Sequence, residues 1–203
     1  MPSPDSPTPR FSPDNRKRLL QLALDSIQHG LANGRALRVD ISSYPERLRE
    51  DLACFVTLNR NGMLRGCIGH LEAQQPLVRD VAENAFAAAF RDPRFPALSE
   101  GELAGLKIHI SILSPSQPVE FSSEQDLINQ MRPGIDGLIL NLGGRSGTFL
   151  PSVWESLPDA PSFLNHLKLK AGLASDFWSD DIRMYRYTTE SFTDSELSEP
   201  TKA

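Results

Sequence analysis

The chain has 203 residues, of which 39% are hydrophobic and 23% are charged, and its formal net charge is −5. This balance is typical of a globular protein with one substantial core or two small ones. The acidic charge counts against non-specific nucleic-acid binding, and no apolar run approaches the ~20 residues of a membrane-spanning helix. The first residues lack the apolar core of a signal peptide, and two cysteines are too few for a secreted disulfide scaffold, so a cytoplasmic protein is expected.

The N-terminal third predicts a tail, a helix and a hairpin. Residues 1–11 are rich in proline and serine, which is typical of a disordered tail. Ser12 and Pro13 suit the cap and first turn of a helix, whose apolar spacing continues to residue 31. Residues 54–58 and 63–68 predict two strands, because Asn61-Gly62 between them favours a tight hairpin turn.

The rest of the chain alternates between short helices and strands. An alanine-rich helix is expected over 76–91, and its small side chains indicate a close neighbour. Residues 106–113 alternate apolar and polar side chains, which predicts a half-buried strand. A short helix at 124–131, a hairpin at 137–150 with a loop at 143–147, a helix at 161–171 and a strand at 183–188 follow. The close hairpins favour antiparallel pairing and therefore an α+β fold.

Residues 64–70 are the most informative segment, because Cys67 lies there between Gly66 and Gly69. Alternate residues of a strand share a face, so Arg65 and Cys67 are expected together, and a nearby arginine favours the thiolate. His70 falls on the opposite face unless the chain bends at Gly69. Two interpretations stay open: Cys67 is an activated nucleophile or ligand, or it is a small buried residue of a tightly packed hairpin.

The other candidates also have two interpretations each. Gly66 and Gly69 either admit a ligand or mark a bulge and a strand end. Arg65 and Arg94 form an anion site, or each is a surface charge or a partner for Asp92. His109 is a general base, a metal ligand or a solvated residue of its strand. The histidine and cysteine spacing matches no closed zinc motif, so no metal site is predicted.

These segments, taken in order, resemble the AMMECR domain family, whose bacterial and archaeal members are often called AmmeMemoRadiSam system protein A. The resemblance covers about residues 15–192 and centres on Leu-Arg-Gly-Cys-Ile-Gly at 64–69. Companion motifs lie at 55–58, 92–95, 111–114, 150–155 and 170–173. The chain departs from the family pattern at His109, where many members have glutamate.

The resemblance implies an α+β fold with a mainly antiparallel sheet flanked by helices. It also implies two unequal subdomains with a cleft between them, and places the segment from Arg65 to Cys67 near that cleft. The AMMECR domain is expected over residues 12–192, between the tail at 1–11 and a disordered acidic tail at 193–203. Memo-type and radical-SAM proteins are the implied partners, and no cofactor is named.

Two classes of function follow. In the first, the protein is an enzyme, or a component of an enzyme system, whose reaction is unassigned. Its catalytic candidates are Cys67, Arg65 and His109, and its substrate-binding candidates are Gly66, Gly69, His70 and Arg94. In the second, it is a non-catalytic binding or adaptor module that recognises a partner protein or a nucleotide-like ligand. The sequence does not decide between them.

Overall fold

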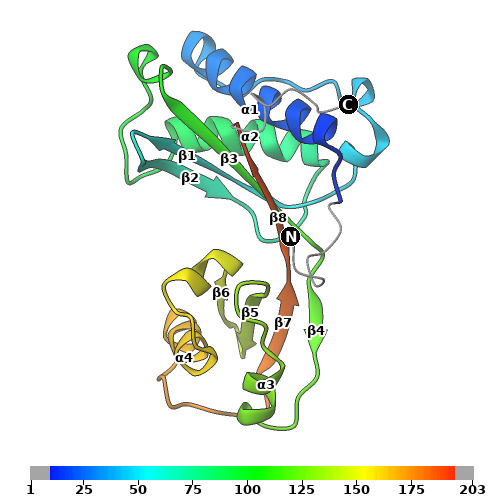
Figure 1. Ribbon diagram of the computed structural model, residues 1–203, viewed down its shortest axis with the longest axis vertical. Coiled ribbons are helices and arrows are strands. Elements are labelled where there is room, and N and C mark those ends of the chain that lie inside the picture. The colour runs from blue at the N-terminus through cyan, green and yellow to red at the C-terminus, as the bar shows by residue number, and fades with distance from the viewer. Residues whose placement is uncertain (1–9, 195–203) are drawn as a thin grey trace, which may run out of the picture. The chain divides into compact units, whose positions relative to one another are not determined.

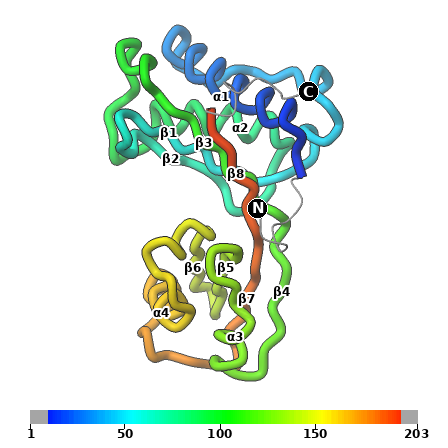
Figure 2. Tube along the Cα trace, in the orientation of Figure 1, coloured from blue at the N-terminus to red at the C-terminus, as the bar shows by residue number. Residues whose placement is uncertain are grey.

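The computed structural model describes residues 10–194, and the chain divides into two compact units of unequal size. The first unit contains the residues up to Leu113 and those from Glu190, and the second contains residues 114–189. Figure 2 traces this path, in which the chain leaves the first unit after β3 and re-enters it in β8. The expectation of two unequal parts is therefore confirmed.

The first unit combines two helices with a four-stranded sheet (Figure 1). The helices are α1 (Pro13–Asn33) and α2 (Leu77–Phe90). The sheet has the order β2-β1-β3-β8, with β1 (Cys54–Arg60), β2 (Met63–Gly69), β3 (Leu106–Leu113) and β8 (Thr189–Thr193). The strand β1 pairs antiparallel with both β2 and β3. Asn61 and Gly62 take positive φ angles of 52° and 76°, as the predicted hairpin turn requires.

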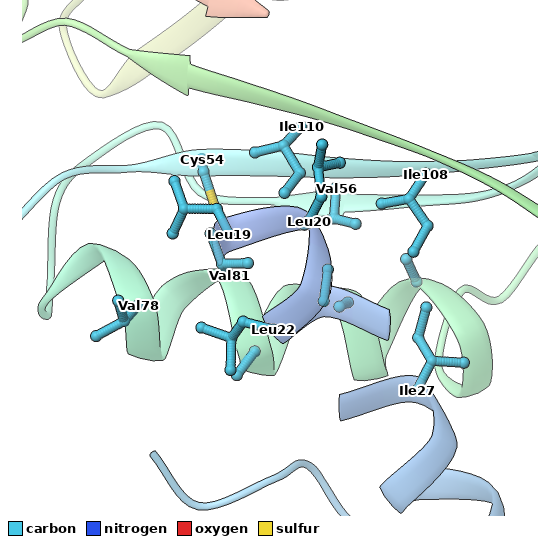
Figure 3. Packing of buried hydrophobic residues seen from close by; sticks show 14 of the residues in the cluster. Leu19, Leu20, Leu22, Ile27, Cys54, Val56, Val78, Val81, Ile108 and Ile110 are labelled. Carbon is cyan, nitrogen blue, oxygen red and sulfur yellow. The ribbon is translucent and has the colours of Figure 1, made fainter. Parts of the chain in front are cut away.

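The core of the first unit lies between the two helices and one face of the sheet (Figure 3). Alternate residues of β1 and β3 point into it, since side chains alternate across a strand. Examples are Val56 and Ile110, which meet Leu19 of α1 and Val81 of α2 in the same cluster. The amphipathic pattern of the sequence thus places both helices on one face of the sheet.

The second unit has a sheet of order β4-β7-β5-β6 with two helices. Its elements are β4 (Gln117–Val119), α3 (Glu124–Gln130), β5 (Gly137–Leu142), β6 (Arg145–Phe149), α4 (Ala160–Lys170) and β7 (Arg183–Tyr187). Trp154 stacks on Phe163 in its core, with ring centroids 3.8 Å apart. The glycine loop expected over 143–147 is shorter, because Arg145 already pairs with Leu142 and leaves a two-residue turn.

Four 3₁₀ helices lie between the longer elements of the described residues. The 3₁₀ helices are Ile41–Ser43, Glu46–Leu48, Glu100–Glu102 and Pro151–Glu155. The expected tails at 1–11 and 193–203 lie mostly outside the described residues, but Phe11 is buried in the first core and Thr193 ends β8. Within residues 10–194, no helix has the length and apolar character needed to cross a membrane.

Candidate functional site

Cys67 lies on the edge strand β2, on the face of the sheet that α1 and α2 do not cover. Its neighbour Ile68 packs against the core of the first unit, and successive side chains of a strand point to opposite faces. Cys67 pairs with Thr57 of β1, and its side chain is partly exposed. The thiol therefore projects from the helix-free face, next to strand β1.

The backbone of Cys67 is held on its outer side by the segment that follows α2. Its N–H donates to Asp92 Oδ2 at 2.9 Å, and its carbonyl oxygen accepts from Arg94 Nη2 at 3.3 Å. Asp92 and Arg94 also form an ion pair at 2.7 Å, in which the Asp92 side chain is only 2% exposed. Hydrogen bonding to Arg94 holds the pKa of the Asp92 carboxyl well below its usual range.

This arrangement brings the thiol close to a hydroxyl. Because both backbone groups of Cys67 bond to the 92–94 segment, Cys67 and Thr57 form a non-hydrogen-bonded pair, the type in which side chains approach most closely. Thr57 Oγ1 lies 3.2 Å from Cys67 Sγ and donates to it. Thr57 was not among the candidates from sequence, since nothing in its local pattern marks it.

Arg65 is directed to a carboxylate and a carbonyl. Its Nε donates to Glu102 Oε1 at 2.7 Å, and its Nη2 donates to the carbonyl oxygen of Pro96 at 2.9 Å. The hydrogen bond from Arg65 lowers the pKa of Glu102 from its ordinary 4.5 to about 2. Since Arg65 and Arg94 are each neutralised by an acid of their own, the structure does not combine them into an open anion site.

The two glycines of the segment admit other parts of the protein. A Cβ at Gly66 would collide with the carbonyl oxygen of Ala88 on α2, so the glycine lets the helix backbone approach the strand. A Cβ at Gly69 would collide with the Phe55 ring and the Cys54 carbonyl oxygen. Within the described structure, both positions serve close packing, and the alanines of α2 have the neighbour that the sequence indicated.

His109 lies in the same row of the sheet as Cys67. It pairs with Thr57 across β1 and β3, on the side opposite to the Cys67 pairing. Paired residues share a face, so Cys67, Thr57 and His109 form a row across three strands. At about 4.8 Å per strand, Cys67 and His109 stand roughly 10 Å apart, too far for direct contact but close enough to flank one ligand.

His70 faces the helix side of the sheet, as the alternation predicted. Its Nδ1 lies 2.7 Å from Asp80 Oδ1 on α2. Asp80 also accepts the N–H of Cys54 at 3.0 Å and Asn84 Nδ2 at 2.9 Å. Neither Asp80 nor Asn84 is among the candidates from the sequence. The pattern that could have identified them is two polar residues four positions apart within the apolar stripe of a helix. Burying an unpaired polar group costs free energy, so such residues are expected to have partners.

Cys54 is a structural cysteine on the opposite face from Cys67. It is fully buried in the first core, and burial raises the pKa of its thiol well above the usual value. The register pairs Cys67 with Thr57, so the two cysteines are not cross-strand neighbours. Within residues 10–194, no group of three or more histidine, cysteine, aspartate or glutamate side chains is placed to hold a metal ion.

The second unit contains a cavity of about 350 Å³ along β4 and β7. Its walls include Glu120, Asp180 and Arg183, together with apolar residues of the two strands. None of the residues selected from the sequence as site candidates lines this cavity.

Comparison with known proteins identifies the family. A family model described as AMMECR1 matches residues 20–192. A protein from Methanothermobacter thermautotrophicus is 36% identical over 90% of this chain and 95% of its own length. One from Thermotoga maritima is 37% identical over 84% of this chain and 94% of its own.

A solved structure agrees with these sequence relationships. The uncharacterized protein PH0010 from Pyrococcus horikoshii superimposes with a TM-score of 0.81 at 34% identity, covering 91% of this chain and 93% of its own. This agreement supports the α+β fold with antiparallel sheets that the sequence predicted. With a family model that spans most of the chain, and relatives that match along nearly their whole length, the chain belongs to the AMMECR1 family.

Proposed function

We propose that this AMMECR1-family protein is a component of an enzyme system, and that Cys67 is its reactive group. The observation that carries the proposal is the geometry at Cys67. Its backbone N–H and carbonyl oxygen are hydrogen-bonded to Asp92 and Arg94, and its thiol projects from the helix-free face. A reactive side chain must be held within a fraction of an ångström of its working position, and fixing the backbone on both polar groups achieves this.

The surroundings of the sulfur suit nucleophilic chemistry. Thr57 Oγ1 is placed to hydrogen-bond the negative sulfur that forms when the thiol loses its proton. His109 stands two strands away in the same row, so an electrophilic substrate lying across β1 would have the thiol at one end and an imidazole at the other. Arg65 then acts as a positioning residue, because its guanidinium ties β2 to Glu102 and Pro96.

The partners are proposed from the family resemblance. Memo-type and radical-SAM proteins would act in the same system, with the substrate bound on the helix-free face of β1 and β2. Arg94 supports this assignment, because its side chain is 54% exposed and reaches the Cys67 carbonyl from solvent. It can therefore contact a substrate or partner while still holding the strand.

A binding or adaptor module is the second candidate, and a specific observation favours it. Four of the selected residues are used in packing or ion pairing within the first unit: Arg65, Gly66, Gly69 and Arg94. Because these residues stabilise the fold, the segment is suited to form a rigid surface that binds a partner. In that case the thiol of Cys67 would be an unreactive part of the recognised surface.

Alkylation separates the two candidates. The folded protein is treated with iodoacetamide over a pH series, and modification of each cysteine is followed by mass spectrometry with buried Cys54 as the internal control. A reactive group predicts that Cys67 is alkylated faster than free cysteine at the same pH, whereas buried Cys54 stays unmodified. Alkylation of Cys67 no faster than that of free cysteine overturns the proposal in favour of the adaptor.

Reconstitution tests the system itself. Cys67→Ser and Cys67→Ala are compared with the unchanged protein in a mixture with Memo-type and radical-SAM proteins. Loss of turnover with retained complex formation supports a reactive thiol. Full turnover by Cys67→Ser contradicts it.

A further inference from the structure

His70 is held at the end of β2 by a backbone hydrogen bond and by contacts of its ring with α2. Its backbone N–H donates to the carbonyl oxygen of Cys54 at 3.1 Å, which continues the β1–β2 ladder by one residue. Its ring lies over the start of α2, with Nδ1 2.7 Å from Asp80 Oδ1. The His70 side chain is 38% exposed, whereas that of Asp80 is 2% exposed. A partly exposed imidazole is therefore within hydrogen-bond distance of a buried carboxyl group.

The carboxyl group of Asp80 is fixed by donors on its other oxygen. Asp80 Oδ2 accepts the N–H of Cys54 at 3.0 Å and Nδ2 of Asn84 at 2.9 Å. Asn84 Nδ2 also reaches the Cys54 carbonyl oxygen at 3.2 Å. A backbone donor and a neighbouring side chain on the same helix thus leave Oδ1 facing the histidine. Gln75, which also contacts Glu83, approaches Oδ1 from the outer side at 3.4 Å.

These contacts determine the tautomer of His70. An ionised carboxylate only accepts hydrogen bonds, so the 2.7 Å contact requires that Nδ1 carries the proton. Asn84 Nδ2 lies 3.5 Å from the same nitrogen, and this longer contact is then not a hydrogen bond because both groups are donors. The lone pair of the neutral ring is then on Nε2, which makes no hydrogen bond within residues 10–194. An aspartate in this position orients the ring and stabilises the imidazolium that forms when Nε2 accepts a proton.

We propose that His70 and Asp80 form a proton-transfer dyad, in which His70 Nε2 accepts a proton from a hydroxyl or amine group of a bound small molecule and Asp80 positions the ring. The proton moves from the ligand oxygen or nitrogen to Nε2, and the ring becomes the imidazolium paired with the Asp80 carboxylate. The ligand class is a molecule that presents an O–H or N–H proton to the end of β2, on the helix side of the sheet.

The dyad is separate from the site of the proposed function. His70 lies one residue beyond β2 and faces the helix side of the sheet, whereas Cys67 faces the other side, so the imidazole is not the base for the thiol. An unreactive Cys67 would therefore not contradict the proposed dyad, and evidence against the dyad would not contradict the proposed reactivity of Cys67.

The tautomer is tested first, in the unchanged protein. Long-range ¹H–¹⁵N correlation spectra of the imidazoles at alkaline pH report which ring nitrogen carries the proton. Two other histidines provide references of known geometry: His166 Nδ1 donates to the Ser162 carbonyl oxygen, and His29 Nδ1 accepts from Asn33. We expect His70 to match His166 in carrying its proton on Nδ1. A proton on Nε2, as in His29, overturns the dyad.

Reactivity is tested next with diethyl pyrocarbonate, followed by mass spectrometry at each histidine. The Nε2 lone pair attacks the carbonyl carbon, the N–C bond forms, and ethyl carbonate leaves and breaks down to carbon dioxide and ethanol. We expect His70 to react faster than His166, whose Nδ1 donates to a carbonyl oxygen and not to a carboxylate. In Asp80→Asn the His70 rate should fall roughly tenfold, with His166 unchanged.

A control guards against a folding defect. Asp80→Asn keeps a side-chain oxygen that can accept the Cys54 N–H. The circular dichroism spectrum of the variant, and the rate at which diethyl pyrocarbonate modifies His29, show whether α1 and α2 remain folded. If that variant does not fold, His70 against His166 in the unchanged protein still decides the question. A His70 rate at or below that of His166 contradicts the proposal.

Discussion

Asp92 Oδ2 accepts the backbone N–H of Cys67 at 2.9 Å, although the two residues are 25 positions apart. The contact joins the two most distinctive motifs of the chain, the Leu-Arg-Gly-Cys-Ile-Gly segment and the Asp-Pro-Arg-Phe turn. It also solves a structural problem. β2 is an edge strand, and the outward polar groups of an edge strand are otherwise available to pair with another chain. The Asp92–Arg94 pair occupies them at Cys67.

Removing the Asp92 carboxylate should release this strand edge. In Asp92→Ala, the Cys67 N–H loses its acceptor, so its hydrogen exchange should accelerate and the free energy of unfolding should fall by about 1–3 kcal/mol. Exchange is followed by NMR and stability by urea unfolding with circular dichroism. Asp159→Ala is the control, because it removes the cap of α4 in the second unit. An unchanged Cys67 exchange rate in Asp92→Ala would contradict the role of this contact.

Gly66 should be intolerant of even one added carbon. A Cβ there meets the backbone oxygen of Ala88, which cannot move without displacing α2 from the sheet. We expect Gly66→Ala to destabilise the first unit by about 1–3 kcal/mol, the usual range for overpacking. Gly101→Ala is a matched control, since its Cβ would meet nothing within 4 Å. Equal unfolding midpoints for the two variants would show that α2 does not pack on β2 as closely as described.

Acid should weaken the first unit through Glu102 and Asp92. Both carboxyl groups have lowered pKa values in the fold because arginines bond to them. The unfolded chain therefore takes up protons first, and the stability they contribute is complete above their ordinary pKa values and is lost as pH falls. For Glu102 the loss spans pH 4.5 down to about 2.

Glu102→Gln tests this dependence. The variant should lose less stability than the unchanged protein between pH 5 and pH 2.5, a range that covers most of that window. Glu100→Gln changes the net charge equally on the same 3₁₀ helix but removes no arginine contact in the described part of the chain. Identical slopes for Glu102→Gln and the unchanged protein would exclude the Arg65–Glu102 pair as a source of acid sensitivity.

Local patterns predicted the elements whose causes are local. The first hairpin followed from Asn61-Gly62, and β3 followed from its alternation, with bounds that match at Leu106 and Leu113. The strands β4 and β8 were missed because each is short and mostly polar. Phe192 is the only buried apolar residue of β8, which is too little for a period-two signal.

The site was predictable only in part, because local patterns indicate which face a side chain takes but not which distant residue it contacts. Strand alternation placed Cys67 and His70 on opposite faces, as the structure has them. The partners that define each position come from distant segments: Thr57 from the neighbouring strand, and Asp80 from a face of α2. Local sequence carries no information on such contacts until the topology is known. Arg65 was placed with Cys67 for its charge, whereas Glu102, 37 residues away, is its partner.

In the second unit, a buried ammonium depends on one carboxylate. Lys168 is fully buried, where its Nζ pairs with Glu124 and donates to the Ser175 carbonyl oxygen at 3.2 Å. Removing the carboxylate leaves the buried ammonium without a counter-charge. Replacing the lysine by an apolar side chain of similar volume removes the buried charge itself and avoids that cost. We therefore expect Glu124→Gln to lower the stability of this unit by about 3 kcal/mol, and Lys168→Met to lower it by less.

Tryptophan fluorescence measures this difference directly, since both tryptophans, Trp154 and Trp178, belong to the second unit. Lys170→Met on the same helix is the control. Its side chain is exposed, and its Nζ lies 4.9 Å from the centre of the Phe149 ring, so the change should stay within about 1 kcal/mol. A larger loss for Lys168→Met than for Glu124→Gln would mean that the ammonium is stabilised chiefly by Ser175 and by the Trp178 ring, which lies 5.7 Å from Nζ. The order of the two variants thus shows whether the buried ammonium is held chiefly by the Glu124 carboxylate or by Ser175 and Trp178.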